Sequence, residues 1–212
     1  QEGIVGGTKS DFRRNTARLS LGADLTDKLK LETNAIYTYV DRDALSENNL
    51  GAPLFNAISV PSVIKPFDEN GNFTVLPSGN AAIPGSNLGN EIINPLAQIE
   101  NTYNDYNYKK INCNFGLDYK IFKGFVLSSS IGFNTSNSEA KTFGKQISYG
   151  GKVFDVQRSS VTQGTVNDNN YSFDLFATYN TKIADAHNIT GTLGTTIFKE
   201  WGNGLTATGF DV

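Results

Sequence analysis

The sequence contains one cysteine, one histidine, one tryptophan and no methionine, and it has no long run of apolar residues. The lone Cys113 excludes an intrachain disulfide framework and a CxxC metal-binding knuckle. The absence of about 18 consecutive apolar residues excludes a transmembrane helix, but it does not exclude membrane strands, in which apolar and polar residues alternate. The formal net charge of -3 and the lack of a basic stripe argue against a nucleic-acid partner.

The chain begins at Gln1 without the basic segment and apolar core of a signal peptide. Because it also lacks an initiator Met, we expect it to be a processed or excised piece of a longer polypeptide. Asn, Gly, Thr and Ser are abundant and 11% of the residues are aromatic. This composition favours strands and turns over helices.

The clearest pattern lies in residues 111–133. Apolar or aromatic side chains alternate with mostly polar ones from Ile111 to Ile121 and again from Phe125 to Phe133, on either side of a tight turn at residues 122–124. A period of two predicts strands with one apolar and one polar face. Both strands have about the 9 to 11 residues that a tilted strand needs to cross a bilayer.

Two further hairpins repeat this pattern. Residues 16–25 and 29–39 flank a turn at 26–28, and residues 171–180 and 187–197 flank a turn at 183–186. Residues 41–105 and 138–169 predict long loops, and we expect residues 1–15 and 199–212 to belong to loops as well. Within the first long loop, residues 52–58 and 95–100 predict short helices, the second with Asn94 as its N-cap and Pro95 in its first position.

Short and long connections therefore alternate strictly, as they do in outer-membrane barrels. We predict an all-β fold, an antiparallel up-and-down transmembrane β-barrel segment of about six strands in three hairpins. The turns would be periplasmic, and the loops 41–105 and 138–169 extracellular. Since the smallest barrels have about eight strands, residues 1–212 are expected to form part of one outer-membrane barrel domain, an incomplete barrel.

The alternation also assigns side chains to faces. On the polar face we expect these residues to line the lumen: Arg18, Asp24, Lys30, Glu32, Asn34, Asn112, Asn114, Asp118 and Asp174. Aromatic residues near the strand ends are expected at the two membrane interfaces: Tyr37, Tyr39, Tyr106, Tyr108, Tyr119, Phe125, Tyr171, Tyr179 and Trp201. The apolar Ile36, Val126 and Phe176 break the pattern on the polar face; contact with a plug in the lumen and chance are both open explanations.

No pattern predicts a catalytic site, a metal site or a cofactor. His187, with Asp185 nearby, fits a turn or interface residue better than a general base, because it lies at a short-turn end. The acidic stretch at residues 68–72 lacks the downstream Glu of an EF-hand, so a turn is favoured over a calcium loop.

Substrate recognition is expected in the long loops, since binding concentrates on loops held by a rigid scaffold. Four loop aromatics are candidates for contact with substrate or with a lid: Phe55, Phe67, Phe73 and Tyr149. Alternatively, these rings hold together a small core of the loops themselves.

Several short motifs, taken in order, resemble the SusC/RagA-type TonB-dependent outer-membrane transporters. They are SDFRRNTARL at residues 10–19, FNA at 55–57, FDENGNF at 67–73, NPLAQIE at 94–100 and LDYKIFKG at 117–124. The resemblance implies a bacterial outer-membrane transporter with a large barrel, an N-terminal plug and a TonB box. It also implies a SusD-like lipoprotein lid and TonB-powered import of oligosaccharides or peptides. The plug and the TonB box are absent from this sequence.

The sequence therefore predicts a fragment of such a transporter that supplies wall, lumen lining and loops, without enzymatic activity or cofactors. Its expected partners are the lipid bilayer, the SusD-like lipoprotein, the substrate and, through the missing part, TonB. The alternative is a soluble or surface-attached β-sandwich that binds glycans or proteins, because one face of a sandwich strand is also solvated. The two hypotheses differ in what covers the apolar face, which is lipid in a barrel and a second sheet in a sandwich.

Overall fold

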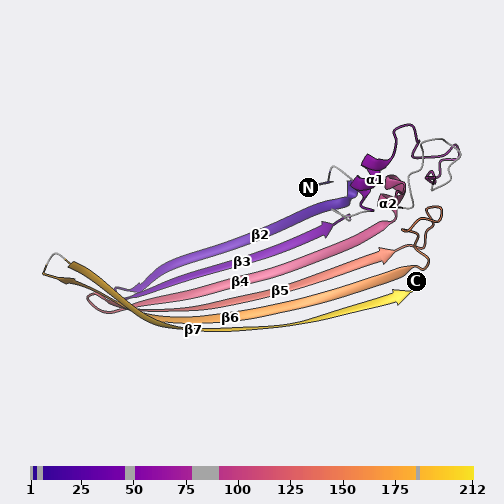
Figure 1. Cartoon of the computed structure of the whole chain (residues 1–212). Coiled ribbons are helices and arrows are strands. Elements are labelled where there is room, and N and C mark those ends of the chain that lie inside the picture. Colours follow the sequence, from indigo (N-terminus) through magenta and orange to yellow (C-terminus); the bar gives the residue numbers. More distant parts are fainter. Residues whose placement is uncertain (1, 4–6, 46–50, 78–90, 185–186) are drawn as a thin grey trace.

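The computed structural model describes residues 2–3, 7–45, 51–77, 91–184 and 187–212. These residues form one antiparallel sheet in which every strand pairs with its neighbour in sequence, in the order β1-β2-β3-β4-β5-β6-β7 (Figure 1). The strands are β1 (Glu2–Gly3), β2 (Gly7–Thr26), β3 (Leu29–Asp43), β4 (Thr102–Phe122), β5 (Phe125–Gly144), β6 (Ser160–Ile183) and β7 (His187–Phe210). The prediction of an all-β, up-and-down, unclosed sheet is confirmed.

The short turns lie at one end of the sheet, as predicted. In the β2–β3 turn, the Thr26 hydroxyl oxygen accepts from the Leu29 amide at 3.0 Å. In the β4–β5 turn, Gly124 has a φ of +88°, and a Cβ there would lie 2.3 Å from the Asn180 carbonyl oxygen. This position therefore requires glycine. In the third turn, residues 185–186, and with them Asp185, lie outside the described residues.

The strands continue far beyond the ends that the sequence predicted. Residues 138–144 belong to β5 and residues 160–169 to β6, so the β5–β6 connection spans residues 145–159 rather than 138–169. The loops expected at residues 7–15 and 199–210 are likewise strand. Polar runs in these segments, such as residues 167–170, contain no apolar residue. The period-two signal disappears where both faces of a strand are polar.

The strand register places all the predicted lumen residues on one face of the sheet. Directly paired residues share a face, and one such row is Arg18–Ile36–Asn112–Asn134–Asn170–Glu200. We call this side the polar face. The other side, the apolar face, contains rows such as Leu21–Thr33–Phe115–Ile131–Phe173–Ile197.

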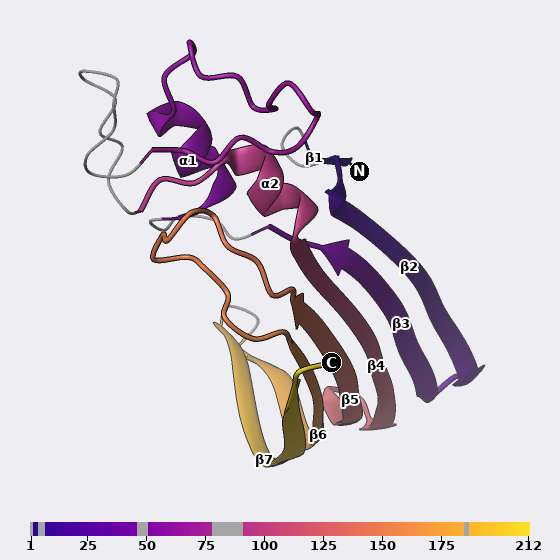
Figure 2. The same ribbon diagram turned by 90° about the vertical axis from the view of Figure 1, so that its right-hand side faces the viewer.

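Within the described residues, no second sheet covers the apolar face. Leu19 is 67% exposed, Phe115 48% and Leu193 80%. Among the described residues the sheet does not close: every residue of β7 is exposed, and β7 lies apart from β2, the long strand nearest the other edge (Figure 2). Within the described residues the sheet thus presents an uncovered apolar face and an edge strand of 24 residues, β7, that pairs on one side only.

Two short helices lie beyond the long-loop ends of the strands (Figure 1). They are α1 (Pro53–Ser59) and α2 (Pro95–Glu100), close to the predicted ranges. The Asn94 side chain accepts from the amides of Leu96 and Ala97, as an N-cap does. Neither helix has the length and apolar character needed to span a membrane.

Candidate functional site: the polar face and the loop cap

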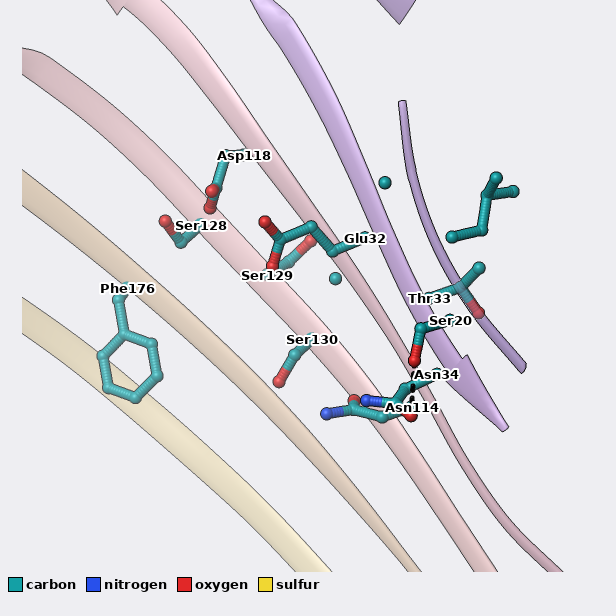
Figure 3. Close-up of a pocket in the computed structure, with 13 residues that line it drawn as sticks. Ser20, Glu32, Thr33, Asn34, Asn114, Asp118, Ser128, Ser129, Ser130 and Phe176 are labelled. Atoms are coloured by element: carbon teal, nitrogen blue, oxygen red, sulfur yellow. Dashed lines mark hydrogen bonds between the residues drawn. The ribbon is translucent and has the colours of Figure 1, made fainter. Parts of the chain in front are cut away.

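The polar face carries a hollow of about 480 Å³ on the strands β2 to β6 (Figure 3). Its lining is mostly small and polar and includes Ser20, Glu32, Asn34, Asn114, Ser128 and Ser130. The Ser20 hydroxyl donates to the Asn34 side-chain oxygen at 3.3 Å. Hydroxyl and amide groups at this density can hydrogen-bond to a polar solute in place of water.

Side-chain hydrogen bonds run across the strands on this face. Asn112 donates to Asn134, and Asn134 donates to Asn170 at 2.9 Å. We call these three residues the amide ladder. Each carboxamide offers both donors and acceptors, so the ladder has the same hydrogen-bonding groups as a peptide backbone. It is therefore suited to bind peptide groups or sugar hydroxyls.

In the half of the polar face nearest the short turns, Lys30 is surrounded by acidic side chains. Lys30 lies between Asp24 and Asp118 in one row of the register, and its ammonium is 2.5 Å from a Glu32 carboxylate oxygen. This group leaves no isolated cation in the row.

The apolar Phe176 on the polar face has a structural explanation. A Cβ added to its partner Gly194 would lie 2.1 Å from the Phe176 Cδ1 atom, so the ring lies directly over this glycine. The pairing of Phe176 with Gly194 covers part of the ring with β7, and the residue remains 39% exposed.

The predicted interface aromatics separate by face. Tyr37, Tyr39, Tyr119, Phe125, Tyr171, Tyr179 and Trp201 share the apolar face. Tyr106 and Tyr108 do not, because they pair with Arg42 and Val40 in rows of the polar face. Their assignment to a membrane interface was therefore wrong: both lie an even number of residues from Asn112, which turns them toward the polar side.

The remaining aromatics form two groups separated along the strands. Tyr171 and Tyr179 lie eight residues apart on β6, about 27 Å at 3.4 Å per residue. Tyr171 contacts Trp201 edge-on with ring centroids 6.1 Å apart, and Tyr179 packs with Phe122 and Phe125. The apolar band between the two groups has about the 25 Å height of an outer-membrane barrel's lipid-facing band.

The long connections fold onto one another as a compact unit, which we call the loop cap (residues 51–77, 91–101 and 145–159). Its core contains Ile93, Ala97 and Tyr149, packed by Phe73, Ile147 and Phe154. Asn56 of α1 is completely buried; its amide donates to Gln98 at 2.8 Å and its oxygen accepts from the Ile93 amide at 3.3 Å. The cap therefore has a satisfied polar centre beside an apolar one.

Asp155 organises the β5–β6 connection. Its carboxylate accepts from the amides of Tyr149 at 2.7 Å and Gly151 at 3.1 Å, and from the Ser148 hydroxyl at 2.8 Å. These hydrogen bonds, the one from Tyr149 foremost, hold the pKa of Asp155 below its ordinary value. The buried Lys152 ammonium donates to the Pro77 carbonyl at 3.1 Å, which ties this connection to the first long loop.

The four loop aromatics occupy different environments. Tyr149 is 9% exposed and lies in the cap core, against which Phe73 packs. Phe67 lies against Phe73 with the rings tilted and their centroids 5.2 Å apart, and Phe55 is 37% exposed on α1. Phe55 and Phe67, the latter 43% exposed, are therefore the candidates with the most exposed surface.

The acidic stretch at residues 68–72 is a turn, as favoured. Asp68 accepts from the Asn70 and Asn72 amides at 2.9 and 2.8 Å, and Gly71 has a φ of +81°. Within the described part of the chain, no group of three His, Cys, Asp or Glu side chains has metal-site geometry. His187 is exposed at the start of β7, where it pairs with Ile183.

Several polar-face residues escaped the sequence-based assignment. Arg14, Arg42, Asp168 and Glu200 lie where loops were expected, and Lys110 directly precedes the alternating stretch that begins at Ile111; all five belong to rows of this face. Extending the two-residue alternation along each strand, for example from Arg18 to Arg14, places them on this face.

Solved structures share this fold. A RagAB peptide transporter structure matches 95% of this chain with a TM-score of 0.73 and 17% sequence identity. Structures of the RagAB peptide importer in the "closed-closed" and "open-open" states each match 95% of the chain with a TM-score of 0.72 and 18% identity. The chain spans 22%, 22% and 21% of the length of the three matched chains. No family model matches the chain, and no match was found among curated proteins.

Proposed function

We propose that this chain is a wall segment of a TonB-dependent outer-membrane transporter that imports large nutrients. The observation that carries the proposal is the two-faced sheet: an exposed apolar band of about 27 Å between two aromatic groups on one side, and a polar face on the other. The likeness to RagAB in fold supports it. Residues outside this segment complete the barrel.

The β-sandwich alternative fits less well. A sandwich buries the apolar faces of its two sheets against each other, whereas the apolar face is exposed here and all described strands belong to a single sheet. Lipid is the covering that an exposed apolar band with aromatic borders requires.

The cargo that we propose is an oligosaccharide or a peptide. The matched structures are of a peptide transporter, and the amide ladder offers hydrogen-bonding groups for either class. We propose that the loop cap faces the cell exterior and meets a SusD-like surface lipoprotein. Phe55 and Phe67 are its exposed aromatic contacts for that lid or for cargo. TonB would act on a plug contributed by another part of the polypeptide, and this segment performs no catalysis.

Cell fractionation with an antibody against the loop cap tests this proposal. We expect the antibody to detect an outer-membrane protein, extracted only by detergent and several times larger than the 23.0 kDa of this chain. A water-soluble species of about that mass would contradict the proposal and would favour the sandwich.

A further inference from the structure

Charges of opposite sign are separated in the upper half of the polar face, the rows nearest the loop cap. These rows run from Phe12–Arg42–Tyr106 to Arg18–Ile36–Asn112. Their cations, Arg14, Arg18, Arg42 and Lys110, all lie on β2, β3 and β4. Their acids, Asp168 and Glu200, lie on β6 and β7. β5 contributes only uncharged residues to this face between them.

Two rows show the separation directly. One row begins with Arg18 and ends with Glu200, with the amide ladder between them. The next row carries Lys110 on β4 and Asp168 on β6. At about 4.8 Å per strand spacing, Lys110 and Asp168 lie about 10 Å apart along the sheet and Arg18 and Glu200 about 24 Å. The longer distance excludes a direct ion pair between Arg18 and Glu200, and among the described residues Lys110 and Asp168 form no ion pair.

The upper cations are also not neutralised locally. Among the described residues, no ion pair includes Arg14, Arg18 or Lys110, and all three side chains are exposed. Arg42 instead lies over the Tyr106 ring, 5.1 Å from its centroid. By contrast, Lys30 in the lower half has three acids around it.

We propose that the polar face orients an extended peptide across the strands. The peptide's carboxylate lies at the cations of β2–β4, its ammonium at Asp168 and Glu200, and its backbone along the amide ladder. This inference rests on the proposed function and specifies the cargo. The 24 Å between the charged ends of the Arg18–Glu200 row matches about seven extended residues at 3.4 Å each.

The experiment measures binding of a neutral heptapeptide to the detergent-solubilised intact protein. The peptide is used with free termini, with an amidated C-terminus and with an acetylated N-terminus. We expect each modification to weaken binding about three- to fivefold, since exposed pairs of opposite charge contribute up to about 1 kcal/mol.

Variants assign each terminus to its charges. Lys110→Gln combined with Arg18→Gln should abolish the effect of amidation and leave that of acetylation. Asp168→Asn combined with Glu200→Gln should do the opposite. The matched controls are Lys109→Gln and Glu139→Gln, because both side chains are exposed on the apolar side of the same upper region. Both controls should retain both effects.

The outcomes separate the inference from the proposed function. Equal binding of peptides with free and modified termini would overturn the inference alone. So would the opposite assignment, in which the Lys110 and Arg18 variant abolishes the effect of acetylation and the Asp168 and Glu200 variant that of amidation. Variants that lower the thermal stability of the intact protein without changing either effect would assign the charges to a plug and also overturn it. Failure of every peptide form to bind would overturn both the inference and peptide as the cargo.

Discussion

Asn56 joins several segments of the loop cap through its buried side chain, and its replacement by alanine tests how much the cap depends on them. The side chain is 0% exposed and joins α1 to the Gln98 side chain, the Gly51 carbonyl and the Ile93 amide. Asn56→Ala leaves the Ile93 amide and the Gln98 oxygen without these partners. Because a buried polar group without a partner costs about 1 to 3 kcal/mol, we expect the cap to lose roughly 2 kcal/mol, which is about 30-fold in its opening equilibrium.

Tryptic cleavage after Lys152 reports that opening. Lys152 is 4% exposed, so trypsin reaches it only when the cap opens, and the cleavage rate follows the population of the open form. We expect Asn56→Ala to raise the rate about 30-fold in the intact protein. The control is Leu54→Ala on the same helix, where the side chain is 56% exposed. A rate increase below threefold, or one equal to that of the control, would refute the assigned role of Asn56.

Three further predictions concern the cap and the strands. The hydrogen bonds that Asp155 accepts lower its pKa. Their contribution to cap stability is therefore present above the ordinary carboxyl pKa of about 3.9 and is lost as the pH falls through the lowered pKa. Cleavage of the cap by an acid-stable protease should show this loss in the native protein and not in Asp155→Asn. Gly194→Val should destabilise the sheet by about 1 to 3 kcal/mol in urea unfolding, since its Cβ would lie 2.1 Å from the Phe176 ring; Gly191→Val, with nothing within 4 Å, is the control, and equal effects would contradict this packing. Gly124→Ala should cost at least about 1 to 2 kcal/mol in the same measurement, because a left-handed residue with a Cβ is strained.

The sequence predicted the strands well where one face is apolar and poorly where both faces are polar. Between the two aromatic groups, the alternation from Ile111 to Ile121 placed β4 in the correct register with respect to faces. Toward the long-loop ends, residues such as Asn167 and Asn169 have the composition of a loop, and only their pairing with β5 and β7 shows that they belong to a strand. Local patterns contain no information about such pairing partners.

Some features of the loop cap were likewise predictable from local sequence signals, and others were not. The α2 helix was predictable because Asn94 and Pro95 are local start signals. The burial of Asn56 was not, because its partner Ile93 lies 37 residues away in the sequence. Tyr149 likewise enters the core through contacts with residues of another connection, so neither its burial nor that of Asn56 could follow from spacing.

The orientation of the two faces is the central claim, and adjacent positions on β4 test it most directly. In a background in which Cys113 and any other cysteine of the intact protein are replaced by serine, single cysteines at Asn114 and Phe115 are labelled with an environment-sensitive fluorophore. The labelled protein is then placed in lipid bilayers. These positions lie on the polar and apolar faces respectively. We predict that brominated lipid quenches the label at position 115 and that aqueous iodide quenches the label at position 114. Equal quenching of both labels by iodide, without quenching by brominated lipid, would contradict a membrane wall.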